Sequence, residues 1–152
     1  MMKQMKVLLV DDEEEFVKTL AERIEMRKAK SEVALNGEEA LKAMDEDLPD
    51  VMVLDLKRPG IDGLEVLRRA KKAYSGVQII MLTGHGSEKD EKEARRLGVF
   101  EYLQKPVEFE KLMRTITKAY KTKFESSMVA ASFAEAGEFD TAKRIMDEED
   151  KK

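Results

Sequence analysis

Hydrophobic residues along the chain alternate between short apolar runs and longer segments with helical spacing. The runs are rich in β-branched residues and almost continuously apolar, which is typical of strands covered on both faces. They occupy residues 6–10, 32–35, 51–55, 77–82 and 99–104. The other segments predict helices at 13–29, 38–47, 64–74, 87–98 and 107–120. In the first helix, one apolar stripe is formed by Phe16, Val17, Leu20 and Ile24.

Strands that alternate with helices predict right-handed βαβ crossovers and one open parallel sheet. We therefore expect an α/β fold with a five-stranded, doubly wound, flavodoxin-like sheet and helices on both faces. The expected domain boundaries are 1–121 for this unit and 122–152 for a helical extension.

The expected extension carries its own helix signals. No Pro or Gly occurs between Val107 and Ala136, so the last helix either continues beyond the sheet domain or breaks near 122–126 and restarts. Gly137 is a predicted helix C-cap and Asp140 a predicted start of another helix. The resulting hairpin is similar to one tetratricopeptide-type helical pair, which would have to pack on the domain, on a second copy or on a partner.

Composition excludes several classes of protein. The chain of 152 residues has a formal net charge of -4 with both signs abundant, so no broad positive field favours direct nucleic-acid binding. Cysteine is absent, which rules out disulfides and thiolate zinc sites. The N-terminal apolar run is too short for a signal peptide or a membrane span. We expect a cytoplasmic protein without membrane insertion.

Polar residues follow the predicted strands at the edge where ligands of such sheets bind. Strand one is followed by Asp11 and Asp12, strand three ends on Asp55, strand four leads into Thr83, and strand five is followed by Lys105. Taken singly, the paired acids could be favourable charges at a helix N-terminus. Likewise, Asp55 could start a turn, Thr83 could be a strand-end hydroxyl and Lys105 a solvated lysine. Their joint placement favours a common site.

This ordered set resembles the receiver domain of two-component response regulators, over roughly residues 4 to 120. The resemblance implies that Asp55 accepts a phosphoryl group from the phosphohistidine of a sensor histidine kinase or phosphotransfer protein. It also implies Mg²⁺, which prefers oxygen ligands. The implied ligands are Asp11, Asp12, Asp55 and the backbone carbonyl of Lys57.

The same resemblance assigns further roles. Thr83 and Lys105 stabilise phosphoryl oxygens, and Thr83 with Tyr102 forms the switch that responds to phosphorylation. A cis peptide is expected between Lys105 and Pro106. The positions of Lys57 and His85 flank the acyl phosphate and tune its lifetime.

We expect the phosphorylated protein to signal through contacts with other proteins. The surface that changes comprises helix four, strand five and helix five, about residues 87 to 120, and a homodimer could form through it or through the C-terminal helices. The alternative is a scaffold that keeps the receiver fold without its phosphochemistry and acts through its C-terminal helices.

Two other site types are disfavoured by the sequence. Haloacid-dehalogenase-type phosphatases typically place a second aspartate two residues after the nucleophile, where this chain has Lys57. We therefore expect no enzyme acting on an external substrate, although the protein could remove the phosphoryl group from its own aspartate. His85 lies between glycines without other imidazoles or thiols, so it does not predict a phosphohistidine or a transition-metal site.

Overall fold

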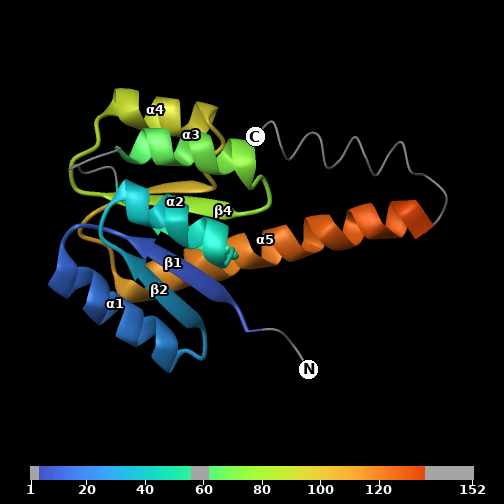
Figure 1. Cartoon of the computed structure of the whole chain (residues 1–152), viewed down its shortest axis with the longest axis horizontal. Coiled ribbons are helices and arrows are strands. Elements are labelled where there is room, and N and C mark those ends of the chain that lie inside the picture. The colour runs from blue at the N-terminus through green and yellow to red at the C-terminus, as the bar shows by residue number, and fades with distance from the viewer. Residues whose placement is uncertain (1–3, 56–61, 136–152) are drawn as a thin grey trace.

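A five-stranded parallel sheet with helices on both faces forms the body of the molecule (Figure 1). The structure is a computed structural model that describes residues 4–55 and 62–135, with side chains to residue 125. The strand order is β2-β1-β3-β4-β5 and every pair is parallel, which confirms the predicted fold class. The strands are β1 (Lys6–Val10), β2 (Lys30–Ala34), β3 (Val51–Leu54), β4 (Gln78–Thr83) and β5 (Glu101–Gln104).

Helices cover the two faces unequally. The helices are α1 (Glu14–Met26), α2 (Gly37–Glu46), α3 (Gly63–Ala73), α4 (Glu88–Arg96) and α5 (Phe109–Glu135). Figure 1 shows α1 and α5 on one face and α2, α3 and α4 on the other, and the buried residues form two matching core clusters. The side chains of Asn36, Asp62 and Ser87 accept backbone amide hydrogen bonds and so start α2, α3 and α4.

Burial explains the continuous apolar runs. All residues of β3 and all but the first residue of β1 are buried, because helices cover the sheet from both sides. A strand that alternated apolar and polar residues would place its polar side chains against the helices on one face of the sheet. These strands therefore deliver the residues that follow them to the edge of a rigid sheet.

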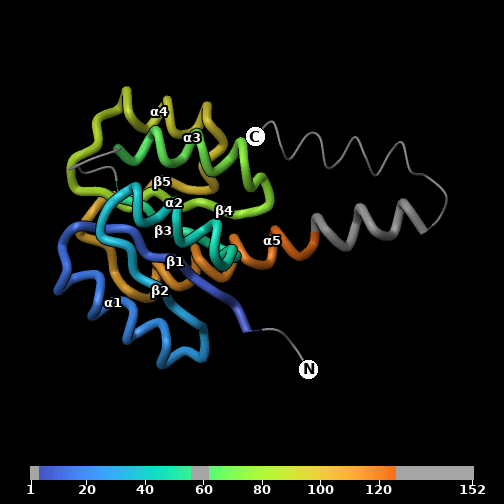
Figure 2. Tube along the Cα trace, viewed as in Figure 1, coloured from blue at the N-terminus to red at the C-terminus, as the bar shows by residue number. Residues whose placement is uncertain are grey.

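The last helix is continuous from Phe109 to Glu135, so the alternative of a break near 122–126 is wrong. Figure 2 shows its coloured part, up to residue 125, leaving the sheet body rather than turning back along it. At the point of departure, Lys123 Nζ donates to Asp50 Oδ1 at 2.9 Å. The predicted hairpin around Gly137 and Asp140 lies outside the described residues. Within the described ranges, no helix combines the length and apolar character needed to cross a bilayer.

The predicted apolar stripe on α1 is buried over most of its length, with Phe16 as the exception. Its other members Val17, Leu20 and Ile24 are buried, but Phe16 remains 38% exposed. The reason is its place near the carboxyl edge of the sheet, where its ring contacts Lys105 and borders an open groove.

Candidate functional site

Three aspartates converge where the strand order reverses. Strand β1 lies between β2 and β3, and the register aligns Val10 with Leu54. Asp11 and Asp55 follow these two residues, so both leave the sheet at the same level. One carboxylate oxygen from each of Asp11, Asp12 and Asp55 lies within 4.8 Å of the other two.

Lys105 reaches this cluster from the end of β5. Its Nζ donates to Asp11 Oδ2 at 2.6 Å and to Asp55 Oδ2 at 3.2 Å, and it forms an ion pair with Glu13 Oε2 at 3.6 Å. The Asp55 side chain is only 3% exposed and that of Lys105 15%. Charge-assisted hydrogen bonds in such a shielded place are stronger than their counterparts in water.

Burial and charge shift the ionisation of this cluster. Burial raises the pKa of the Asp11 carboxyl above its ordinary value, because desolvation outweighs the hydrogen bonds from Lys105 and from the Glu13 amide. The charge of Asp55 adds to the rise. Burial would lower the pKa of Lys105, but its contacts with Asp11 and Asp55 outweigh that effect, and the pKa is raised. The ammonium is therefore held in its charged form.

One carboxylate oxygen of the cluster is an unsatisfied hydrogen-bond acceptor among the described residues. This oxygen, Asp12 Oδ1, is buried. Leaving a charged acceptor unsatisfied costs more than the ~1–3 kcal/mol typical of a neutral group. A small cavity of about 10 Å³ is lined by all three aspartates. An all-oxygen donor set with an unsatisfied buried carboxylate fits a hard divalent cation such as Mg²⁺.

The loop after β4 borders the same edge. Thr83 is fully buried, its Oγ1 accepts from the His85 amide at 3.1 Å, and its carbonyl accepts from the Lys105 amide at 2.9 Å. Tyr102 on β5 is buried, and its hydroxyl has no partner among the described residues. A Cβ atom on Gly86 would lie 1.6 Å from that hydroxyl, so this tyrosine position requires glycine at residue 86.

The structure thus brings most of the predicted residues to one edge. Asp11, Asp12, Asp55 and Lys105 form one cluster, and Thr83 lies on the strand between Asp55 and Lys105. The Lys105–Pro106 peptide is cis. Lys57, a predicted ligand through its carbonyl, lies outside the described residues.

Sequence reasoning missed two neighbours of Lys105. Glu13 was given no role, although it forms an ion pair with Lys105. Phe16 was predicted only as part of the apolar stripe of the first helix, and its ring centroid lies 4.5 Å from Lys105 Nζ. No local signal marks the Phe16 contact, since its partner is distant in sequence.

Comparison with known proteins points to one family. Residues 7–117 match the model described as the response regulator receiver domain. An NtrX-like response regulator of Rickettsia conorii is 35% identical over 120 residues, which are 78% of this chain and 25% of that protein. The response regulator MprA of Mycobacterium avium is 31% identical over 134 residues, 86% of this chain and 59% of that protein. The chain therefore spans between a quarter and three fifths of these curated relatives.

Solved structures agree with the sequence matches. A receiver domain of Clostridium thermocellum is 32% identical with a TM-score of 0.74, covering 78% of this chain and 96% of that one. A CheY-like receiver domain protein of Methanospirillum hungatei has a TM-score of 0.79 at 24% identity, covering 81% of this chain and 98% of that one, and supports the fold alone.

Proposed function

This chain belongs to the response regulator receiver domain family, and we propose that it accepts a phosphoryl group on Asp55 from a histidine kinase or phosphotransfer protein. The observation that carries the proposal is the gathering of Asp11, Asp12 and Asp55 within 4.8 Å of one another, with Lys105 bonded to two of them. Among the residues that the structure describes, the cluster leaves the buried Asp12 Oδ1 without a hydrogen-bond partner, which supports a role in binding a cation.

In the proposed reaction, a carboxylate oxygen of Asp55 forms a bond to phosphorus while the bond from phosphorus to the donor's imidazole nitrogen breaks. Asp11, Asp12 and Asp55 would hold Mg²⁺, with the Lys57 carbonyl proposed as a fourth ligand, and the cation would supply positive charge against the aspartates and the phosphoryl oxygens. Asp12 Oδ1, which has no hydrogen-bond partner among the described residues, would be available as a ligand atom.

Lys105 and Thr83 serve the transferring group. The Lys105 ammonium lies 3.2 Å from Asp55 Oδ2. From there it can stabilise the negative charge of a phosphoryl oxygen during the transfer. We propose that the Thr83 hydroxyl gives up its contact with the His85 amide and donates to the phosphoryl group instead. The loop that carries His85 and Gly86 would move with it, and Tyr102 packs against that loop.

We propose that the signal leaves through protein contacts. The candidate surfaces are α4, β5 and α5 within about residues 87 to 120, and the helical extension beyond residue 121, either of which could form a homodimer. The continuity of α5 supports the second route, since one rigid helix begins in the sheet core and ends outside it. The proposed domain boundary near 121 and the role of His85 and Lys57 in phosphoryl lifetime rest on family resemblance.

The test uses the full chain with Mg²⁺ and acetyl phosphate. We expect the intact protein to gain the mass of one phosphoryl group, and Asp55→Asn to gain none under the same conditions. Size measurement with and without Mg²⁺ and beryllofluoride then reports whether the assembly changes. A protein that stays unmodified, with its size unchanged by beryllofluoride, would favour the scaffold alternative. Cytoplasmic location and the absence of an external substrate remain predictions.

A further inference from the structure

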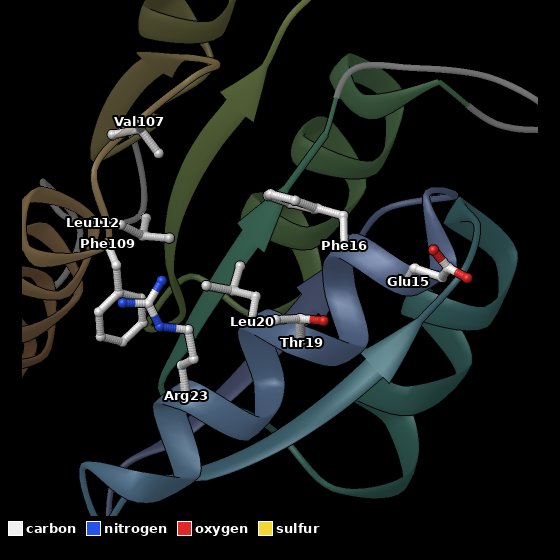
Figure 3. Close-up of a pocket in the computed structure, with 8 residues that line it drawn as sticks. All are labelled: Glu15, Phe16, Thr19, Leu20, Arg23, Val107, Phe109 and Leu112. Carbon is white, nitrogen blue, oxygen red and sulfur yellow. The ribbon is translucent and has the colours of Figure 1, made fainter.

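Phe16 lies where the phosphoacceptor site meets an open groove. Figure 3 shows its side chain reaching from α1 across a groove of about 350 Å³, whose other wall includes Phe109 and Leu112 of α5. The ring is only partly covered, so burial alone gives an incomplete reason for its position. Its centroid lies 4.5 Å from Lys105 Nζ, well within the range of a cation–π contact.

We propose that Phe16 is a positioning residue for phosphoryl transfer, holding the Lys105 ammonium over the Asp55 carboxylate with the face of its ring. This inference rests on the proposed function. Lysine carries its charge on a long stem with several rotatable bonds, so an ammonium that is to meet a phosphoryl oxygen has to be restrained.

The other contacts of the ammonium do not suffice for that restraint. Lys105 bonds to Asp11 and Asp55, the same carboxylates that line the candidate metal site. A cation bound there competes with the ammonium for these oxygens. The aromatic ring offers a negative face without a ligand atom for Mg²⁺, so it keeps attracting Lys105 when the carboxylates are shared.

A matched pair of substitutions separates positioning from packing. Phe16→Leu keeps an apolar side chain in the groove but removes the aromatic face, whereas Phe16→Tyr keeps the face. Phe109→Leu is the control, because Phe109 lies in the same groove and stacks against Arg23, at 4.0 Å, instead of Lys105. Thermal unfolding of each variant shows whether it is folded.

The measurement is the initial rate of phosphorylation of the full chain by acetyl phosphate at saturating Mg²⁺. We expect Phe16→Leu to slow it about fivefold to tenfold, the size of one cation–π contact, and Phe16→Tyr to restore it. Phe109→Leu should react like the unmodified protein. The Mg²⁺ affinity should stay the same in all four proteins.

A second readout needs no phosphorylation. In the unmodified protein, the ring current of Phe16 should move the Lys105 methylene protons next to Nζ upfield in NMR spectra, and Phe16→Leu should remove that shift. Equal rates in Phe16→Leu and the unmodified protein, failure of Phe16→Tyr to restore the rate, or ordinary Lys105 shifts would overturn the inference alone. If the unmodified protein took up no phosphoryl group, the proposed function would fall, and the role of Phe16 with it.

Discussion

Lysines and acids gather at both ends of the sheet, but they are arranged differently. At the amino end, Lys6 Nζ contacts Glu32 at 3.2 Å and Asp47 at 2.8 Å. Asp50 there accepts from the Lys6 amide with one oxygen and from Lys123 Nζ with the other, each at 2.9 Å. The charges nearly balance, and both oxygens of the half-buried Asp50 are satisfied.

The carboxyl end lacks that balance. One ammonium, that of Lys105, contacts Asp11 and Asp55, while Asp12 Oδ1 is buried and has no hydrogen-bond partner within residues 4–55 and 62–125. Among the side chains that the structure describes, the other buried polar atom without a partner is the Tyr102 hydroxyl, which lies against Gly86 at the same end. The comparison teaches that a satisfied cluster indicates a structural role, whereas an unsatisfied one indicates a missing ligand or a movable part.

The largest expected difference between the ends concerns phosphorylation. Asp12→Asn removes a charged oxygen from the candidate metal site, so the Mg²⁺-dependent rate with acetyl phosphate should fall about 100-fold. Asp50→Asn makes the same chemical change at the amino end and should leave the rate per folded molecule unchanged. Equal losses in the two variants would show that the two clusters are not functionally distinct.

The free energy of unfolding should depend on Asp50 at the amino end of the sheet, whereas the phosphorylation rate depends on Asp12 at the carboxyl end. Asp50→Asn replaces an acceptor of two hydrogen bonds by an amide with one acceptor oxygen, so the free energy of unfolding in urea should fall by about 1–3 kcal/mol. Asp47→Asn is the control, because its side chain is 74% exposed and its ion pair with Lys6 contributes at most about 1 kcal/mol. A larger loss from Asp47→Asn would contradict the structural role given to Asp50.

The last predicted effect concerns the contact between Tyr102 and Gly86. Gly86→Ala should displace the tyrosine and lower the free energy of unfolding by about 1–3 kcal/mol, as overpacking does. In a Tyr102→Ala background the clash with the tyrosine is removed and the remaining close neighbour is Thr83 Cγ2 at 3.1 Å, so most of the cost should disappear in a double-mutant cycle. Additive losses would mean that Tyr102 does not occupy the position against Gly86.

The sequence was most informative about backbone elements and least about contacts between them. Continuous apolar runs predicted the buried strands, and strand ends predicted the edge shared by Asp11, Asp55 and Lys105, because parallel strands bring their carboxyl ends together. The contact of Phe16 with Lys105 could not be predicted, since periodicity gives the face of a helix but not what lies opposite its first turn.

Other features depended on long-range packing as well. The Lys123–Asp50 bond joins residues 73 positions apart, and a sequence without Pro or Gly allows α5 to continue without requiring it. The fit of Tyr102 against Gly86 depends on side-chain packing between a strand and a loop. Such contacts carry no local pattern from which they could be inferred.

Chemical trapping of the acyl phosphate tests the central claim most directly. The full chain is incubated with Mg²⁺ and acetyl phosphate, reduced with borohydride, digested and mapped by mass spectrometry. The account predicts that Asp55 is the residue converted, and that Asp50, the half-buried aspartate at the other end of the sheet, is untouched. Conversion of a different acid, or none at Asp55 in folded protein with Mg²⁺ present, would contradict it.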